Sequence, residues 1–352
     1  MTCTVTVSCA HASQVSTRSS SHASHHVTAR ILLTGSTGFV GGAVLAALCD
    51  RNEHAVRVAL RTPHADTPDR AGGALDASVV GELNGSTHWD AAVEGVSTVI
   101  HLAGLAHLPS STSEAERRFD AVNRAAAVAL GRACLRAGVR RLVYVSSIKV
   151  NGETTNLGAP FKSTEASALP LPSDPYGRSK ARAERELLEL ARASDGALTV
   201  VCVRPPLVYG PGVRANFGAL VRAVARGLPL PFAGIDNRRS LVAVENLADF
   251  LIRAALHPGV RSGVLLVSDG EDLSTPELIS RIGVAMHRPA RLFAVPRAVW
   301  SACDALGGRP AAVAQSLTGT LQVDSRASHE QIAWRPPVSV TDALARAVAG
   351  VS

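Results

Sequence analysis

A glycine-rich loop between a short apolar strand and a helix constrains the fold of this chain most strongly. Ile31–Thr34 has the pattern of a buried strand, glycines follow at Gly35, Gly38 and Gly41, and a helix is expected over 43–50. In this context the glycines permit a tight turn, a close approach of the backbone to a pyrophosphate, and close packing of helix on strand. The helix N-terminus then offers free N–H groups to phosphate. The pattern predicts a dinucleotide site, with an empty glycine turn as the alternative. The expected cofactor contacts here are Gly35, Thr37, Gly38, Phe39 and Val40.

The residue after the second strand bears on the choice of cofactor. The strand expected over Ala55–Leu60 ends at Arg61, and Thr62 and Pro63 follow, so no carboxylate adjoins it. An acidic residue at this place accepts a hydrogen bond from the ribose of NAD, whereas an arginine accommodates the 2′-phosphate of NADP. We therefore predict that NADP(H) is preferred and that NAD(H) is possible. The alternative is that Arg61 only faces solvent.

A third strand, expected over 96–104, ends in small residues. Small residues at that end let a dinucleotide lie close to the backbone. Glu82 and Leu83, which precede this strand, could contact the adenine. The cofactor contacts expected from this part of the chain are Glu82, Leu83, Ala103 and Gly104.

A fourth strand and the helix after it carry the residues expected to do chemistry. The strand over 141–145 runs into Ser147, and hydroxyls at the carboxyl end of a parallel strand lie where ligands bind in open α/β sheets. Tyr176 and Lys180 follow four residues apart on a helix that Asp174 is suited to cap. They share one helix face, so a nearby ammonium can favour the phenolate. Such a pair also occurs by chance in many helices.

The order of these motifs resembles a known family. The glycine loop, Asn123, Ser147, Tyr176 and Lys180 match the extended short-chain dehydrogenase/reductases, the NAD-dependent epimerase/dehydratase family, in order and spacing. The likeness continues through 204–212 and covers essentially everything from residue 29 onward. It implies an α/β fold with a Rossmann-type doubly wound parallel sheet and a smaller α/β substrate-binding domain.

The resemblance also implies roles for individual residues. Tyr176 would be the general acid/base, Lys180 would lower its pKa and hold the nicotinamide ribose, and Ser147 would hydrogen-bond the substrate oxygen. Asn123, which lies in an apolar stretch and needs a polar partner, would help to hold the active-site helix and a proton-relay water. The further cofactor contacts implied by the family are Asn123, Val145, Lys180, Pro205 and Val208.

Two residues after the serine exclude one branch of the family. The 4,6-dehydratases follow the catalytic Ser or Thr with an Asp-Glu pair that moves protons, whereas this chain has Ile148 and Lys149. An isoleucine transfers no proton and a lysine inverts the charge. What remains is oxidation and reduction at carbon 4 of a nucleotide sugar.

Three functions stay open. Because Arg61 favours NADPH, we place reduction of a UDP-4-keto-6-deoxy-(N-acetyl)hexosamine first, as in surface polysaccharide (lipopolysaccharide O-antigen) biosynthesis. A UDP-glucose or UDP-N-acetylglucosamine 4-epimerase with retained NAD is the alternative, and the likeness to a UDP-glucose 4-epimerase-like subgroup supports it. A non-catalytic NADP-binding regulator is the third, although such proteins commonly lose the Tyr/Lys pair.

The second half of the chain supplies residues for a nucleotide-diphosphate sugar. Arg239 matches the family arginine that reaches the diphosphate, and arginine suits phosphate geometry. A solvated basic turn is the alternative for Arg238 and Arg239. Many relatives have a second arginine before a final Asp, and 316–324 lacks it. The expected substrate contacts are His107, Ser147, Lys149, Asn216 and Arg239; His107 is equally well explained as an incidental loop residue.

The domains follow from the placement of these motifs. We expect a disordered extension over 1–28, where His22, His25 and His26 could bind a metal only if ordered. The cofactor domain is expected over 29–205 with short pieces near 240–268, and the substrate domain over 206–239 and 269–350.

Composition sets the remaining expectations. The net charge of +7 is spread along the chain, which argues against a nucleic-acid surface. Six scattered cysteines suggest thiols in a reducing cytoplasm and no metal site. No apolar run is long enough to cross a membrane. The family resemblance suggests a homodimer.

Overall fold

The computed structural model describes residues 30–63, 76–106, 108, 112–213, 215–306 and 308–350. The extension expected over 1–28 and the predicted substrate contact His107 lie outside these residues.

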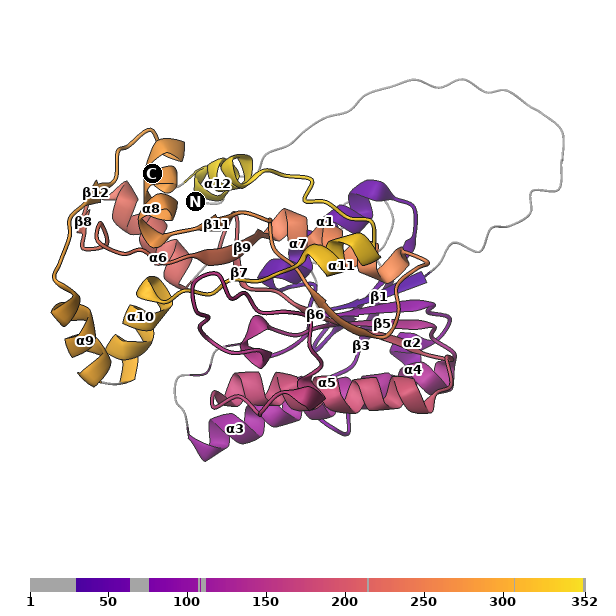
Figure 1. The fold of residues 1–352 in the computed structure, drawn as a ribbon. Coiled ribbons are helices and arrows are strands. Elements are labelled where there is room, and N and C mark those ends of the chain that lie inside the picture. Colours follow the sequence, from indigo (N-terminus) through magenta and orange to yellow (C-terminus); the bar gives the residue numbers. More distant parts are fainter. Residues whose placement is uncertain are drawn as a thin grey trace, which may run out of the picture.

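A seven-stranded parallel sheet forms the centre of the fold (Figure 1). Its strand order is β10-β6-β5-β4-β1-β2-β3, so the direction of strand addition reverses between β1 and β4. Ligands bind outside the carboxyl ends of the strands at such a switch point. The predicted doubly wound α/β class is confirmed. The strands are β1 Arg30–Thr34, β2 Ala55–Leu60, β3 Asp76–Val79, β4 Thr98–His101, β5 Arg141–Val145, β6 Thr199–Arg204 and β10 Gly263–Leu266.

Helices cover both faces of this sheet (Figure 1). One apolar cluster joins the sheet to α1 and α7, and another joins it to α2, α4 and α5. Alternate residues of the same strand serve the two clusters, because successive side chains point to opposite faces. Both faces are therefore dry, as is usual for parallel sheets. The helices are α1 Phe39–Arg51, α2 Asp90–Val93, α3 Ser113–Phe119, α4 Ala126–Ala137, α5 Pro175–Ala193, α7 Val244–Leu256 and α11 Arg326–Gln331.

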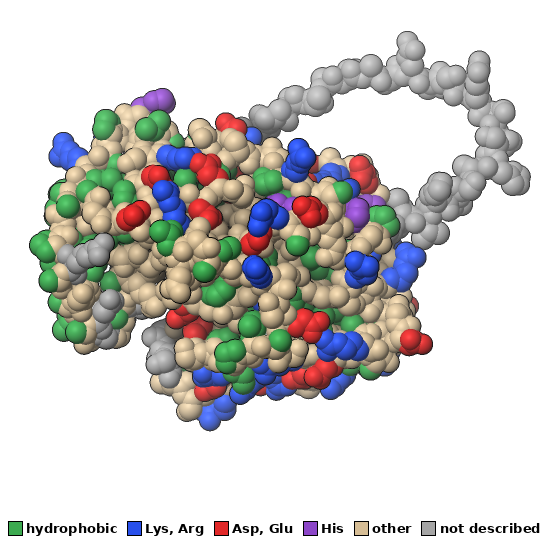
Figure 2. Space-filling view, viewed as in Figure 1, with side chains coloured by type: hydrophobic (Ala, Val, Ile, Leu, Met, Phe, Trp, Pro, Cys, Tyr) green, Lys and Arg blue, Asp and Glu red, His purple; other side chains and the backbone are tan. Residues whose placement is uncertain are grey.

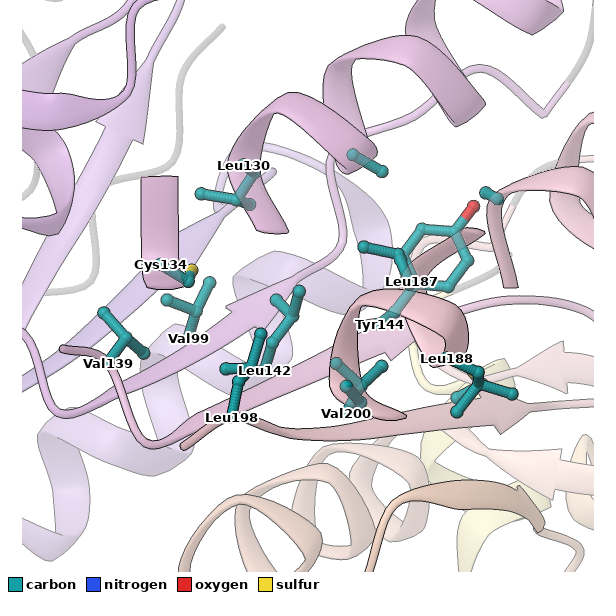
Figure 3. Close-up of a cluster of buried hydrophobic side chains, with 14 of the residues drawn as sticks. Val99, Leu130, Cys134, Val139, Leu142, Tyr144, Leu187, Leu188, Leu198 and Val200 are labelled. Carbon is teal, nitrogen blue, oxygen red and sulfur yellow. The ribbon is translucent and has the colours of Figure 1, made fainter. Parts of the chain in front are cut away.

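Figure 3 shows the cluster on the α4 and α5 side, where Tyr144 is the largest labelled side chain. The Tyr144 ring is fully buried, and its hydroxyl donates to the backbone oxygen of Asn123 at 3.0 Å. A buried phenol needs such a partner. This contact fixes the polypeptide around Asn123 against β5, next to the residues expected to do chemistry.

The remaining elements build a smaller part with its own apolar cluster. It contains a three-stranded sheet, β11-β9-β7, and a two-stranded sheet, β12-β8. Figure 1 shows these strands and their helices to one side of the large sheet. The elements are β7 Leu207–Tyr209, β8 Pro229–Leu230, β9 Arg239–Ala243, β11 Asp272–Leu273, β12 Arg291–Leu292, α6 Ala215–Ala225, α8 Thr275–Ala285, α9 Arg297–Leu306, α10 Gly308–Thr318 and α12 Val340–Val348.

The helix after the glycine loop begins earlier than the sequence suggests. We expected it to start at residue 43, whereas α1 starts at Phe39 and includes Gly41 and Gly42. Glycine disfavours a helix interior, but a Cβ at Gly41 would lie 1.9 Å from the Gly35 oxygen. The close contact between α1 and the loop therefore requires glycine at position 41.

Candidate active site

The helix α5 presents Tyr176 and Lys180 at its first turns. Asp174 caps it by accepting from the Gly177 N–H at 2.8 Å, and Pro175 occupies the first turn, as expected. Lys180 is 5% exposed, and its Nζ donates to the Val145 oxygen at 2.8 Å and lies 4.6 Å from the Tyr144 ring centroid. Burial lowers the pKa of Lys180 to about 8, although the Glu184 carboxylate opposes this.

Ser147 and Tyr176 form the other half of the group. The Ser147 hydroxyl lies beside the Tyr176 phenol, and the Phe119 ring lies edge-on to the phenol at 5.9 Å between centroids. Burial raises the pKa of Tyr176 to about 12; the Ser147 hydroxyl opposes this increase and the charge of Asp174 adds to it. We expected Lys180 to lower this pKa. In the protein alone the balance is different, because the ammonium is directed at Val145 and Tyr144 and burial of the phenol dominates.

Asn123 lies in a π-helical turn, Asp120–Ala125, between α3 and α4. It is fully buried, and its Oδ1 accepts from the Leu105 N–H at 2.8 Å. Its Nδ2 donates to the Leu105 oxygen at 2.9 Å and to Ser179 Oγ at 3.0 Å. Leu105 and Ser179 are therefore the polar partners that Asn123 was predicted to need. These bonds join the loop after β4 to α5, which leaves the amide occupied by the protein itself.

A pocket of 390 Å³ lies at the carboxyl ends of β1, β2 and β4. Eight predicted cofactor residues meet in it, although they come from four separate segments. The other seven predicted cofactor residues do not line it: Phe39, Val40, Asn123, Val145, Lys180, Pro205 and Val208. The eight are Gly35, Thr37, Gly38, Arg61, Glu82, Leu83, Ala103 and Gly104.

Missing side chains shape this pocket for a dinucleotide. A Cβ at Gly35 would lie 2.7 Å from the Ala103 nitrogen, and one at Gly104 would lie 2.9 Å from Asn123 Oδ1 and 3.5 Å from Lys180 Nζ. The N-cap of α1 is Gly38, and no side chain caps the helix there. An uncapped helix N-terminus beside a glycine-lined pocket fits a pyrophosphate. The residues present therefore fit the cofactor that the motif predicts.

The pocket also holds residues that the sequence did not single out. Trp89, Arg118 and Val122 line it, and Arg118 forms no ion pair within the described part of the chain. Arg118 reaches the pocket because α3 packs on α5 and on the π-helical turn that follows it. No local pattern in the sequence signals that placement.

A buried polar chain supports the pocket from the end of β4. His101 Nδ1 lies 2.7 Å from Thr34 Oγ1, which accepts from the Ala103 N–H at 3.1 Å. His101 stacks on Tyr144, with 5.9 Å between ring centroids. Burial, with a smaller contribution from the charge of Lys180, lowers the pKa of His101 to about 3. His101 is therefore neutral and structural at physiological pH.

The predicted substrate residues have defined partners in the protein. Asn216 Nδ2 donates to Ser316 Oγ at 3.0 Å, and Arg239 Nη1 donates to the Gly319 oxygen at 2.7 Å. Burial lowers the pKa of Arg239. Arg238, whose side chain is 38% exposed, pairs with Glu277 at 2.6 Å, so its charge is already matched by a carboxylate. The segment 316–324, which lacks the second arginine found in many relatives, contacts both Asn216 and Arg239.

Within the described ranges, no group of three or more His, Cys, Asp or Glu side chains could hold a metal ion. Among the described helices, none has the length and apolar character to cross a membrane.

The chain is similar to known proteins over most of its length. The model of the NAD dependent epimerase/dehydratase family matches residues 31–265. A Vibrio cholerae protein named UDP-glucose 4-epimerase is 40% identical over 317 residues, which are 89% of this chain and 92% of that protein.

Solved structures share the fold. The structure of MoeE5 with UDP-glucuronic acid and NAD is 25% identical, has a TM-score of 0.67, and matches 91% of this chain and 97% of that one. A UDP-N-acetylglucosamine 4-epimerase from Methanobrevibacter ruminantium M1, bound to UDP-N-acetylmuramic acid, has a TM-score of 0.70 at 21% identity, with the same coverage of each chain. The second likeness shows the fold alone.

Proposed function

The chain belongs to the NAD-dependent epimerase/dehydratase family, and from this premise we propose that it is a UDP-sugar 4-epimerase. The observation that carries the proposal is the 40% identity, along nearly the whole of both chains, to a protein named UDP-glucose 4-epimerase. This places the epimerase ahead of the 4-ketoreductase that Arg61 favoured on the sequence alone. The site supports either reaction, because both need one proton-handling group at carbon 4.

Tyr176 and Ser147 are the residues that act on the 4-hydroxyl of the sugar. A bound NAD would supply the acceptor that takes a hydride from carbon 4 and returns it to the opposite face. Tyr176 takes the proton of the 4-hydroxyl as carbon 4 is oxidised and gives it back as carbon 4 is reduced. Ser147, which lies beside the phenol, holds the same oxygen.

The loop after β5 excludes other proton chemistry. Ile148 is buried and apolar, and the Lys149 Nζ lies 2.7 Å from Glu153 Oε1. Elimination of a 6-hydroxyl needs an additional acid/base pair at these two positions. Their character therefore supports chemistry at a single carbon, as the sequence predicted.

Reduction of a UDP-4-keto-6-deoxy-hexosamine is the second candidate, and two observations favour it. Arg61 and Arg118 both line the cofactor pocket, and two cations suit the extra phosphate of NADP. In addition, a Tyr176 pKa of about 12 in the protein alone keeps the phenol protonated at neutral pH. A ketoreductase starts from that protonated form, whereas an epimerase starts from the phenolate.

One experiment separates the two. The purified protein is denatured to identify any retained nicotinamide, and the native protein is supplied with UDP-glucose, UDP-galactose and their N-acetyl derivatives. Interconversion with tightly retained NAD supports the epimerase. No interconversion, together with oxidation of added NADPH by a UDP-4-keto-6-deoxy sugar, overturns it in favour of the reductase.

A non-catalytic regulator is tested with Tyr176→Phe. This variant removes the acid/base while leaving the ring that packs on Phe119. We expect turnover to fall by roughly 10²- to 10⁴-fold with cofactor binding unchanged. Full complementation of a deletion strain by the variant would favour the regulator.

Assembly and compartment are parts of the same proposal. We propose a homodimer through the helices around Asn123 and Lys180, where side chains of both charges alternate along the lower edge of Figure 2. Arg124 pairs there with Asp120 at 2.6 Å and with Glu186 at 2.9 Å. The free thiols Cys134 and Cys202 are buried, which supports a reducing cytoplasm. Sedimentation equilibrium that shows only a monomer would contradict the dimer.

We further propose that the smaller part is the substrate domain. Its own apolar cluster and its place to one side of the large sheet support this division (Figure 1).

A further inference from the structure

The Lys149 side chain bridges two carboxylates beside the active site. Its Nζ lies 2.7 Å from Glu153 Oε1 and 3.5 Å from Asp174 Oδ2. The lysine side chain is 40% exposed and the Asp174 side chain 26%, so the second pair is partly shielded from solvent. Although burial lowers it, the hydrogen bond to Glu153 and the charge of Asp174 raise the pKa of Lys149 overall. Lys149 is therefore a cation throughout the neutral range.

The backbone of the same residue holds the catalytic serine. Lys149 lies in a 3-10 turn, Ile148–Val150, which Ser147 caps by accepting from the Lys149 N–H at 3.3 Å. The first turn of α5 packs on this backbone, because a Cβ at Gly177 would lie 3.2 Å from the Lys149 oxygen. Lys149 thus touches the loop that carries Ser147 and the helix that carries Tyr176.

Lys149 contacts the N-cap of the catalytic helix through Asp174. The carboxylate oxygen that faces Lys149 also accepts from the Gly177 N–H at 2.8 Å, so it is fixed in place. It lies two residues before Tyr176, and a negative charge so close disfavours a phenolate. An uncompensated Asp174 would therefore oppose the ionisation that the reaction requires.

We propose that Lys149 is a positioning residue that fixes the Ser147 loop against the Tyr176 helix and neutralises the Asp174 cap. The inference rests on the proposed function, because it assigns the acid/base role to Tyr176. In the 4,6-dehydratases this position holds an acid/base glutamate. In this chain Lys149 acts through Tyr176 instead, and not on the substrate.

The groups that face Tyr176 come from every neighbouring element. Ser147 and the buried phenol of Tyr144 face it from β5 and its end, whereas the Lys180 ammonium on its own helix is directed at the Val145 oxygen and the Tyr144 ring. From α3 the Phe119 ring contacts it, while the nearby Glu116 is paired with Arg178 at 3.1 Å. Among these groups Asp174 is the carboxylate that raises the pKa of Tyr176, and Lys149 is its cationic partner across the loop.

The test follows the ionisation of Tyr176 directly. The chain has three tyrosines, so ¹³C labelling at tyrosine Cζ gives three NMR resonances, and Tyr176→Phe assigns one of them. Burial raises the pKa of Tyr144 and of Tyr209 even further, so Tyr176 is the first to titrate. The titration needs no substrate and is therefore independent of turnover.

The variants are Lys149→Met, which keeps the length and removes the charge, Lys149→Arg, which keeps the charge, and Glu153→Gln as the matched control. We expect Lys149→Met to move the Tyr176 titration to higher pH and to lower kcat/KM near pH 7 by about threefold to tenfold, with KM little changed. Lys149→Arg should restore both. Glu153→Gln should leave the Tyr176 titration in place, because the pair with Asp174 remains.

A double-mutant cycle isolates the pair. Asp174→Asn keeps a capping side chain and should move the Tyr176 titration to lower pH. In that background Lys149→Met should have no further effect on the titration. If Lys149→Met moves Tyr176 equally with and without Asp174, the coupling through Asp174 is wrong.

Two other results separate this inference from the proposed function. A raised KM with an unmoved Tyr176 resonance in Lys149→Met would show that Lys149 contacts substrate, and would overturn the inference. If no UDP-sugar is turned over by the wild-type enzyme but Lys149→Met still moves the resonance, the proposed function fails and the positioning role stands.

Discussion

The guanidinium of Arg204 and the carboxylate of Glu184 form an ion pair in which neither side chain is exposed to solvent. Arg204 Nε lies 2.9 Å from Glu184 Oε1, and its Nη1 donates to Asn151 Oδ1 and to the Thr164 oxygen, both at 2.8 Å. Glu184 lies one helical turn after Lys180. The pair therefore joins α5, the strand β6 and the segment 151–164 behind the active site.

Removal of one member of this pair should destabilise the fold strongly. Glu184→Gln leaves a buried guanidinium without its counter-charge, for which about 3 to 5 kcal/mol of unfolding free energy is a typical loss. The measurement is urea unfolding at neutral pH. The exposed pair of Arg136 and Asp90 provides the control, since Asp90→Asn should leave the urea midpoint almost unchanged. Equal losses at the two sites would contradict the buried pair's importance.

A substitution at Gly35 should weaken cofactor binding through close contact and not through backbone strain alone. Gly35 has a φ of 75°, and its Cβ would meet the backbone at Ala103. Gly138 has a φ of 72° and nothing within 4 Å of the added Cβ, so Gly138→Ala measures the strain by itself. We expect NAD affinity, measured by calorimetry, to fall at least tenfold in Gly35→Ala and to stay unchanged in Gly138→Ala. Similar affinities in both variants would show that the loop does not cradle the cofactor.

Acidification should destabilise the protein through His101. Its folded pKa is about 3, below the ordinary value of 6.5, so the unfolded chain binds a proton that the native chain does not. Stability is therefore fully present above pH 6.5 and is lost as the pH falls towards 3, by a few kcal/mol in total. Between pH 7 and 4.5 the unfolding free energy of the wild type should fall more steeply than that of His101→Gln, which can still bond Thr34 but does not titrate. Parallel curves would contradict this.

Arg118 and Arg61 should together determine the cofactor preference. If both face the 2′-phosphate, the double variant Arg61→Ser/Arg118→Ser should lose affinity for NADP(H) by roughly tenfold to a hundredfold and keep its affinity for NAD(H). Arg117→Ser is the matched control, because Arg117 is the neighbour of Arg118 on α3 but does not line the pocket. Equal loss for both cofactors would place the two arginines on the shared pyrophosphate.

The local features of this fold could be predicted from the sequence, and the reasons are physical. The strand Ala55–Leu60 has the predicted bounds because Arg61 and Pro63 interrupt its apolar run. Asp174 caps α5 as expected because capping depends on the chain within three residues. The need of Asn123 for a polar partner was also predictable.

The remainder depends on contacts between distant segments. No local pattern in the sequence encodes how α3 and α5 pack. This packing determines that Asn123 bonds to Leu105 and Ser179, and that Arg118 reaches the pocket. The pKa of Tyr176 was misjudged for the same reason. Spacing on the helix placed Lys180 beside it, but burial and the Val145 oxygen determine where the ammonium points.

The order in which the sheet is assembled has a consequence for synthesis of the chain on the ribosome. The helix α1, which carries the N-terminus proposed to bind phosphate, packs against α7, and Arg51 pairs with Asp249 across that contact. The edge strand β10 then joins β6 after 58 intervening residues have been made. A nascent chain that stops after β6 leaves the apolar faces of α1 and of the sheet uncovered. We therefore expect the cofactor pocket to become stable late in translation, when about three quarters of the chain has emerged, and premature termination products to aggregate.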